Sequence, residues 1–208
     1  MTILRNVYQS MYKIPENINA HLINTCTARL NNELKRNIWG FVAIAFNRVD
    51  MDRLMKVGPN RLCAEWILKN GGGIRTTANP DFLFKDYNNL PPENVKFFIK
   101  VADATGASIM KIGLQHFNGC KHIDTVIFHN CQHLEEDGLN DILYLTESLK
   151  VLQVSACGNI KDEGLMVIGQ LKNLEMLKIF FMPSVKDLEN VKNQLQKMLP
   201  NCIMDIKK

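Results

Sequence analysis

The fold of this chain is decided by residues 149–171, which read LKVLQVSACGNIKDEGLMVIGQL. In the first half of this stretch apolar residues recur at intervals of two and three, as one face of a short strand requires. In the second half they recur every three residues, as a helix or a tight arc requires. Such a unit exposes an apolar edge when it stands alone, so it needs a neighbour of the same kind to pack against.

The same pattern recurs on both sides of this stretch. Residues 123–145 repeat it with Cys131 in the position that Cys157 occupies 26 residues later, and this offset falls within the leucine-rich-repeat period of about 20 to 29 residues. Residues 174–185 repeat it once more, with Met182 in the cysteine position. The pattern is therefore a repeat and not an isolated element.

A fourth, degenerate copy covers residues 98–117, with Phe98, Val101 and Asp103 in the inward positions. A charged residue in an apolar position is typical of the end of a solenoid, because an end unit faces something other than a repeat. The sequence predicts an α/β fold, in which residues 96–208 form a short leucine-rich-repeat solenoid of about four repeats, of the cysteine-containing type.

The composition is that of an ordinary folded protein. Of the 208 residues, 46% are hydrophobic and 22% are charged, with a net charge of +4. So small a charge gives no case for a nucleic-acid partner, which needs a clustered basic face. No apolar run approaches the roughly 18 to 20 residues of a membrane span. The six cysteines have no framework spacing, which favours reduced thiols inside a cell.

Residues 1–36 have the character of a mitochondrial presequence. Their apolar residues form one helical stripe that ends before Pro15, Arg5 and Lys13 lie opposite it, and no acidic residue precedes Glu16. A basic, amphipathic, acid-poor start is typical of such targeting segments, whereas a secretory signal has a continuous apolar core. An ordinary amphipathic helix of a folded domain is the alternative.

Residues 37–95 predict a small helical amino-terminal domain that covers the open edge of the first repeat. Asp50 is placed to cap one helix, Gly58 ends it, and Pro59 occupies the first position of the next, where its missing N–H costs nothing. A run of three glycines then ends this second helix. Its predicted apolar face carries Leu62, Cys63, Trp66 and Ile67, and its predicted polar face carries Arg61, Glu65 and Lys69.

No arrangement of catalytic side chains is recognisable, so we do not expect an enzyme. His129 and Cys131 are of the types that bind zinc, which leaves a zinc-dependent enzyme as an alternative. However, His129 follows the inward Phe128 on a strand and therefore points outward, whereas Cys131 occupies an inward position that the repeat already explains. Because the two side chains do not share a face, a structural role is favoured for the cysteine.

The strand residues that alternate with the inward positions form the concave face of the predicted solenoid. Several of them are apolar, and an apolar face of this kind is typical of a surface that binds another protein. The alternative is that the carboxy-terminal tail or the amino-terminal domain covers these side chains. The predicted partner-binding residues are Ile127, His129, Val151, Met176 and Phe180.

Three stretches carry a family resemblance: residues 57–68 (VGPNRLCAEWIL), 85–91 (KDYNNLP) and 155–160 (SACGNI). They resemble the mitochondrial coupling factor B family, also called ATP synthase subunit s or distal membrane arm assembly component 2-like. The resemblance extends over nearly everything from Ile38 to the carboxy terminus, and the run from Val57 to Trp66 is its most specific part.

The resemblance implies a non-catalytic protein, peripheral on the matrix side of the mitochondrial inner membrane, that contacts membrane-sector subunits of ATP synthase. There it would support proton conduction through the synthase and limit proton leak. Relatives in the wider family assist assembly of the membrane arm of complex I, so a partnership with complex I assembly intermediates is an alternative. A generic leucine-rich-repeat adaptor, such as a cytosolic ubiquitin-ligase adaptor, is another, although no adaptor-binding helix pair is recognisable before the repeats.

The resemblance also implies a Mg²⁺ ion held by two backbone carbonyls. One is at the glycine of the Val-Gly-Pro motif, here Gly58, and the other lies just after the Leu-Pro pair, where this chain has Pro92 in place of the usual threonine. Proline keeps its carbonyl, so the ligand survives that change. The family's Cys-x-Cys at the second repeat strand is here His129-Asn130-Cys131, so any thiol role would rest on Cys131, alone or with an unidentified partner.

Overall fold

The computed structural model of the chain describes residues 40–208. The chain divides into two compact units, Met1–Val42 and Ala43–Lys208, and the features below belong to the second. The predicted presequence, residues 1–36, lies outside the described residues and stays a prediction.

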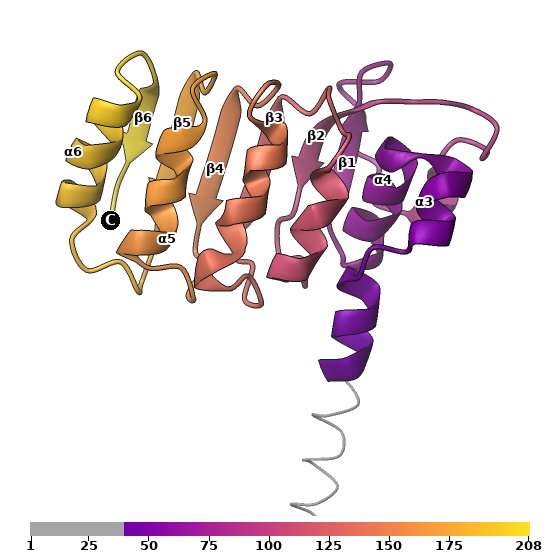
Figure 1. Cartoon of the computed structure of the whole chain (residues 1–208), viewed down its shortest axis with the longest axis horizontal. Coiled ribbons are helices and arrows are strands. Elements are labelled where there is room, and N and C mark those ends of the chain that lie inside the picture. The colour runs from indigo at the N-terminus through magenta and orange to yellow at the C-terminus, as the bar shows by residue number, and fades with distance from the viewer. Residues whose placement is uncertain (1–39) are drawn as a thin grey trace, which may run out of the picture. The chain divides into compact units, whose positions relative to one another are not determined.

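One six-stranded sheet runs through this unit, with its strands in chain order from β1 to β6 (Figure 1). β1 pairs with β2 in antiparallel fashion, and every later pair is parallel. The fold is therefore mixed α/β with a mostly parallel sheet. The strands are β1 (Gly73–Thr76), β2 (Ile99–Asp103), β3 (Thr125–His129), β4 (Val151–Ser155), β5 (Met176–Phe180) and β6 (Ile203–Ile206).

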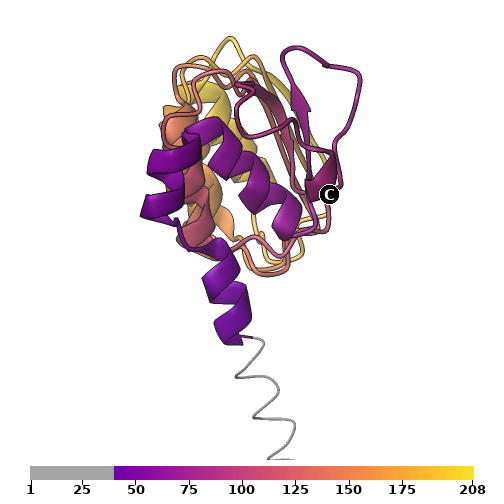
Figure 2. The same ribbon diagram turned by 90° about the vertical axis from the view of Figure 1, so that its right-hand side faces the viewer.

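Helical segments connect the parallel strands and lie together on one face of the sheet (Figure 2). Several are 3-10 helices, in which side chains three residues apart lie above one another, and this accounts for the apolar spacing of three in the sequence. The segments are η2 (Lys111–Phe117), η3 (Glu136–Leu145), α5 (Asp162–Met166) continued by η4 (Val167–Gln170), and α6 (Leu188–Met198).

The predicted inward positions of the central strands are confirmed. In β3 and β4 the register places Val126 beside Leu152 and Phe128 beside Val154, and all four side chains are 0% exposed. Alternation along each strand sends one set of side chains under the helices and the other set to the opposite face. The core is therefore one continuous apolar layer between the sheet and its helices.

Close packing against the preceding helical segment explains the glycine of the Gly164-Leu165 pair in α5. A Cβ atom on Gly164 would lie 2.5 Å from the backbone oxygen of Glu136 in the preceding segment. Because real Cβ atoms do not approach backbone atoms that closely, a side chain at this position would force the two segments apart. Leu165, the other member of the pair, is fully buried.

The inward positions predicted for the degenerate copy are wrong by one residue. Phe98 is exposed and Asp103 is paired in register with Ile127 on the open face, whereas Ile99, Ala102 and Ala104 are buried. A slip of one residue exchanges the two faces of a strand. The leucine-based pattern failed here because two of the true inward residues are alanines, so larger neighbours gave the false register.

The amino-terminal helices are close to their prediction. α3 (Met51–Val57) is capped by Asp50, whose side chain accepts from the N–H of Arg53, and α4 (Pro59–Lys69) begins at Pro59. The apolar face of α4 is buried as predicted. Glu65 departs from the prediction, because it is 1% exposed and not solvated.

β1 was not anticipated, since the glycine run after α4 was expected only to end the helix. Gly71 takes a left-handed φ of 89° that lets the chain reverse, and the following residues pair with β2. Ile74 is fully buried and also bridges to Phe84 across a hairpin-like excursion. The short 3-10 helix η1 (Tyr87–Asn89) follows before the chain enters β2.

Candidate functional site

The sheet face opposite the helices, here called the exposed sheet face, carries all five predicted partner-binding residues. Each of them is partly exposed. The register places Val151 of β4 beside Met176 of β5, and Met176 beside Ile203 of β6, so apolar side chains form a row across three strands. The face also carries Thr125, Ile127, His129, Gln153, Lys178 and Phe180.

Polar atoms in the middle of this face are paired with one another. The Nδ1 atom of His129 lies 2.8 Å from the hydroxyl of Ser155, and the amide of Gln153 donates to the same hydroxyl at 3.0 Å. The ring of Phe180 lies 6.3 Å from the His129 ring. These hydrogen bonds pair the Ser155 hydroxyl with His129 and Gln153, and the partly exposed Lys178 lies on the same face.

Cys131 lies on the other side of the sheet, fully buried next to Cys157 of the following unit. Its thiol donates to the backbone oxygen of Ala104 at 3.0 Å. The adjacent Cys157 thiol and burial raise the pKa of Cys131 well above its usual range. A thiol held protonated is a poor nucleophile and a poor metal ligand, so this environment favours the packing role that the repeat implies.

His129 and Cys131 do not share a face: His129 ends β3 on the exposed sheet face, whereas Cys131 follows the left-handed turn at Asn130 and is fully buried. Among residues 40–208 no group of three or more histidine, cysteine, aspartate or glutamate side chains is arranged to hold a metal ion. The zinc alternative therefore has no side-chain cluster within this part of the chain to support it.

Gly58 and Pro92, the two residues that the family resemblance assigns to Mg²⁺, lie at the turn between α3 and α4 and in the segment before β2. The oxygen of Gly58 accepts from the N–H of Leu62 at 3.1 Å, and the oxygen of Pro92 accepts from the N–H of Val95 at 2.9 Å. A carbonyl oxygen has two lone pairs, so each keeps one available. Oxygen ligands of this kind suit Mg²⁺.

An ion-pair cluster ties the segment containing Pro92 to α3 and α4. Arg53 contacts Glu65 at 2.5 Å and Glu93 at 2.7 Å, and Arg61 contacts Glu65 at 3.1 Å. Burial alone would raise the pKa of Glu65, but hydrogen bonds from both arginines outweigh it and hold that pKa below its usual value. The cluster therefore connects Glu93, which follows Pro92, to both helices.

A polar junction joins the amino-terminal helices to the first unit, and its centre is Asn47, which is 0% exposed. The Oδ1 atom of Asn47 accepts from the Trp66 indole at 3.1 Å and from the Met110 N–H at 3.0 Å. Its amide donates to Asn70 and to the backbone oxygen of Ser108, both at 3.1 Å. A single side chain therefore connects three segments of the chain.

Stacked rings complete the polar junction. Trp66 lies parallel to the ring of His116 at a centroid distance of 4.9 Å and meets Phe117 edge-on at 5.5 Å. Burial lowers the pKa of His116, which favours the neutral imidazole. Its Nδ1 atom bonds to the oxygen of Gly113 at 2.8 Å.

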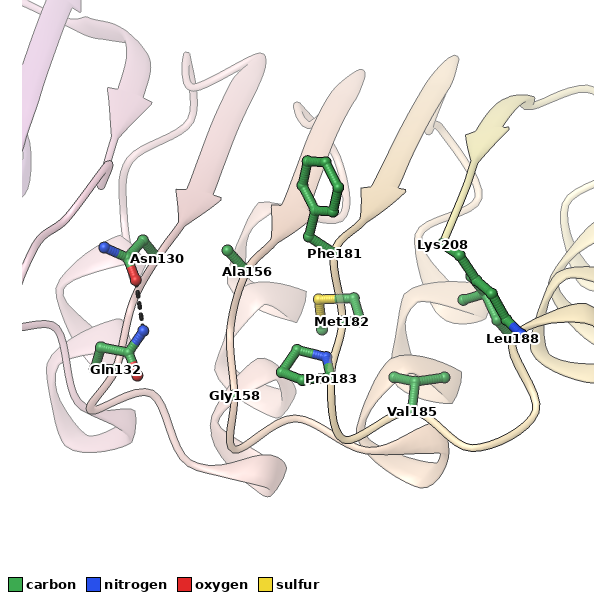
Figure 3. Close-up of a pocket in the computed structure, with 10 residues that line it drawn as sticks. All are labelled: Asn130, Gln132, Ala156, Gly158, Phe181, Met182, Pro183, Val185, Leu188 and Lys208. Carbon is green, nitrogen blue, oxygen red and sulfur yellow. Dashed lines mark hydrogen bonds between the residues drawn. The ribbon is translucent and has the colours of Figure 1, made fainter.

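A hollow of about 560 Å³ lies where β3, β4 and β5 end, here called the carboxyl-edge hollow (Figure 3). Its walls are mainly apolar, with a pair of hydrogen-bonded amides from Asn130 and Gln132 on one side and a lysine on the other. The residues that line it are Asn130, Gln132, Ala156, Gly158, Phe181, Met182, Pro183, Val185, Leu188 and Lys208.

Comparison with known proteins identifies relatives along most of the chain. It is 34% identical over 170 residues to a human protein named ATP synthase subunit s, mitochondrial, and the match spans 80% of this chain and 84% of the relative. The chain belongs to the ATP synthase subunit s family. The mouse and bovine proteins of the same name are 34% and 32% identical over the same length. No protein-family model matches the chain.

Family membership confirms the resemblance predicted from the sequence, but three features of this member of the subunit s family were not foreseen. They are the polar junction, the ion-pair cluster and the carboxyl-edge hollow. Each is built from residues far apart in sequence, and only the acid–base spacing of Arg61 and Glu65 on one helix gave any local signal. Within residues 40–208 no helix has the length and apolar character needed to cross a bilayer.

Proposed function

We propose that this protein is a non-catalytic coupling factor of mitochondrial ATP synthase, peripheral on the matrix side of the inner membrane, that supports proton conduction and limits proton leak. The observation that carries the proposal is the 34% identity to human ATP synthase subunit s over 80% of the chain. The presequence character of residues 1–36 supports the mitochondrial location.

We propose further that the parallel part of the sheet is a cysteine-type leucine-rich-repeat solenoid. Paired residues of successive parallel strands are 24 to 27 residues apart, a step within the repeat period of about 20 to 29. Cys131 and Cys157 occupy equivalent inward positions. The proposed organisation is a presequence over 1–36, a helical cap over 37–95 and the repeat domain over 96–208.

The exposed sheet face is the proposed contact with membrane-sector subunits of the synthase. It combines partly exposed apolar side chains, including Val151, Met176 and Phe180, with polar atoms that are already paired. Burial of these apolar side chains against a partner favours association, and aromatic residues commonly dominate the binding energy of an interface. We expect Phe180 to be the main anchor.

Affinity purification of the tagged full-length chain from mitochondria tests this proposal. Synthase membrane-sector subunits should be recovered, and Phe180→Asp should reduce their recovery at least about tenfold, because a carboxylate replaces an aromatic anchor. The matched control is Tyr144→Asp, which changes an exposed aromatic residue on the helical side and should leave recovery unchanged. Melting temperatures of both variants within about 2 °C of wild type would exclude unfolding as the cause.

Other outcomes contradict specific parts of the proposal. Recovery of complex I assembly intermediates without synthase subunits would replace the synthase assignment by the assembly-factor alternative. Equal loss with Phe180→Asp and Tyr144→Asp would remove the exposed sheet face as the contact. If the chain fused to a fluorescent protein stayed in the cytosol, this result would contradict the interpretation of residues 1–36 as a mitochondrial presequence.

For Mg²⁺, the proposed ligands are the carbonyl oxygens of Gly58 and Pro92, with water completing the octahedral coordination that this ion prefers. Bound there, the ion would brace the turn between α3 and α4 against the segment before β2, alongside the contacts that Arg53 already makes. Calorimetric titration of the metal-free protein with MgCl₂ should give a saturable signal. Absence of saturable binding would contradict the proposed site.

A further inference from the structure

Ser155 differs from its neighbours on the exposed sheet face. Among the side chains that β3, β4 and β5 present to this face, it alone is fully buried. The register places it between two larger residues, His129 of β3 and Phe180 of β5. A buried hydroxyl has no access to water, so it needs its hydrogen-bond partners within the protein.

The two partners of this hydroxyl determine where its hydrogen lies. Within residues 40–208 the Oγ atom bonds to Nδ1 of His129 at 2.8 Å and to the amide nitrogen of Gln153 at 3.0 Å. A serine hydroxyl has one hydrogen to donate and two lone pairs to accept with. Because the Gln153 amide donates to Oγ, the hydroxyl hydrogen is left for Nδ1. The neutral imidazole of His129 therefore carries its own hydrogen on Nε2.

The remaining polar atoms of both partners face solvent. His129 and Gln153 are partly exposed. Among residues 40–208 no buried side-chain nitrogen or oxygen lacks a hydrogen-bond partner, and in that range the only bonds of these two side chains are those to Ser155. The neutral network therefore presents one donor, the Nε2–H of His129, and one acceptor, the Oε1 atom of Gln153, on the exposed sheet face.

A second hydrogen on the imidazole is incompatible with this arrangement. Protonated histidine donates from both ring nitrogens, so Nδ1 of His129 would then donate to Oγ. If Gln153 continued to donate as well, the hydrogen of the buried Ser155 hydroxyl would have no acceptor, which is unfavourable. A half-turn of the Gln153 amide removes the conflict, because Oε1 then accepts that hydrogen. The terminal amide torsion is roughly two-fold, so both orientations are accessible.

Charges of both signs lie around the network on the same face. Lys178 of β5 is paired in register with Gln153, and Asp205 of β6 with Lys178. Asp205 is bound to Lys207 at 2.7 Å. On the other side of β3, Asp103 of β2 accepts a backbone N–H of the loop that follows it at 3.0 Å. The half-turn of the Gln153 amide would replace an acceptor by a donor on the strand next to the Lys178 ammonium.

We propose that His129, Ser155 and Gln153 form a proton-sensitive switch on the exposed sheet face. Uptake of a proton from solvent by His129 reverses the hydrogen bond to Ser155 and turns the Gln153 amide, so the face exchanges an acceptor for a donor and gains a positive charge. Histidine is the side chain that ordinarily changes charge between pH 5 and 8. The switch belongs to the isolated chain. Its effect on partner binding, which would weaken at low pH because an unpaired charge is costly to bury, rests on the proposed function.

NMR spectroscopy of the isotope-labelled full-length chain, titrated from about pH 8 to about pH 5, tests the switch. At the start the Nδ1 signal of His129 should have the shift of an unprotonated ring nitrogen, and the Nε2 signal that of a protonated one. On acidification the side-chain amide signals of Gln153 should shift with the same midpoint as the His129 ring signals. The internal control is Gln194 of α6, whose amide donates to Asn190 and should not follow that midpoint.

Substitutions separate transmission through the hydroxyl from a direct effect of the nearby charge. Ser155→Ala removes the hydroxyl and keeps both partners, so the Gln153 amide signals should lose their response while His129 still titrates. Ser184→Ala is the matched control, because it removes a hydroxyl that donates to the backbone oxygen of Gly158, and it should leave the response unchanged. His129→Phe keeps a ring on the exposed sheet face and should abolish the response.

Three results would overturn the inference. They are a His129 ring that carries its hydrogen on Nδ1 at the start of the titration, Gln153 amide signals that do not follow the His129 midpoint, and a Gln153 response that persists in Ser155→Ala. All three are measured on the isolated chain, without any synthase subunit. Failure of the switch is therefore distinguishable from failure to recover ATP synthase from mitochondria.

Discussion

The stack of β3, β4 and β5 and the polar junction around Asn47 are two ways of joining successive parts of one chain. In the stack the buried inward side chains are apolar and recur at steps of 25 and 26 residues. At the junction a buried asparagine makes directional bonds to segments up to 63 residues away. Among residues 40–208 most of the buried polar residues lie at the amino-terminal end, whereas the stack has only Ser155; the others are Asn47, Glu65, Asn70, Thr76 and His116.

The difference shows that holding two parts of the chain together and fixing their relative orientation depend on different interactions. Apolar contacts are non-directional and roughly proportional to the area removed from water, so they hold the units together but tolerate other side chains of similar volume. Removing one partner of a buried hydrogen bond costs free energy, because the other partner stays desolvated and unpaired. The position of the amino-terminal helices is therefore specified more precisely than that of the elements in the β3–β5 stack.

The largest effect is expected from the stack. Leu152→Ala should lower the free energy of unfolding by about 2 to 5 kcal/mol, since it removes a side chain that is 0% exposed and leaves a cavity. Val151→Ala on the same strand, whose side chain lies on the exposed sheet face, should cost less than about 1 kcal/mol. Urea-induced unfolding measures both, and similar losses in the two variants would mean that the two faces of β4 are assigned wrongly.

The junction should respond almost as strongly, but for a different reason. Asn47→Ala leaves the Trp66 indole N–H and the Met110 N–H buried without acceptors, at an expected cost of about 2 to 4 kcal/mol. Asn173→Ala is the matched control, because that exposed side chain makes only two 3.3 Å bonds to backbone oxygens. If Asn47→Ala were as stable as Asn173→Ala, the position of the amino-terminal helices would not depend on Asn47.

The smallest effect should depend on pH. Because the pKa of Glu65 is lower in the folded than in the unfolded protein, its contribution is present above the ordinary value of 4.5 and is lost as pH falls through the folded pKa. Glu65→Gln should destabilise by about 2 kcal/mol at neutral pH, and the difference in unfolding free energy from wild type should narrow as pH falls below 4.5 through the folded-state pKa. Unfolding curves across that range check this.

If the stability difference between Glu65→Gln and wild type stayed constant with pH, the ion pairs of Glu65 would not be its source. Glu175→Gln supplies the comparison from the repeat units, because Glu175 is exposed and pairs with Lys150 at the surface. Such pairs contribute little to stability, so this variant should show no measurable change at any pH.

The central strands and their two faces were predictable because leucine, valine and phenylalanine at strand spacing can only be buried on one side. Leu152 and Val154 are buried as the pattern requires, and Phe180 lies on the open face. The same local logic gave the start of α4 at Pro59. These features depend on neighbours within a few residues, which a sequence pattern records.

The features that were not predicted depend on contacts with residues far along the chain, which a local sequence pattern does not indicate. Asn47 gives no sign that its bonds reach Ser108 and Met110, 61 and 63 residues later. Glu65 belongs to the predicted polar face of α4, and its burial is not predictable locally because its partner Arg53 lies on another helix. The β2 register was missed since Ala102 and Ala104 satisfy burial through small size, which a search for large apolar residues passes over.

The near-constant step between parallel strands also bears on the order in which the chain folds. Each parallel pairing closes a loop of 24 to 27 residues, so loop-closure entropy favours no unit as the starting point. The bond from Asn47 to Met110 closes 63 residues, which costs only about 0.8 kcal/mol more. Loop length therefore does little to set the sequence of events. Burial of the largest apolar side chains, which include Trp66 and Phe117 beside the polar junction and Phe128 in β3, should decide where folding begins.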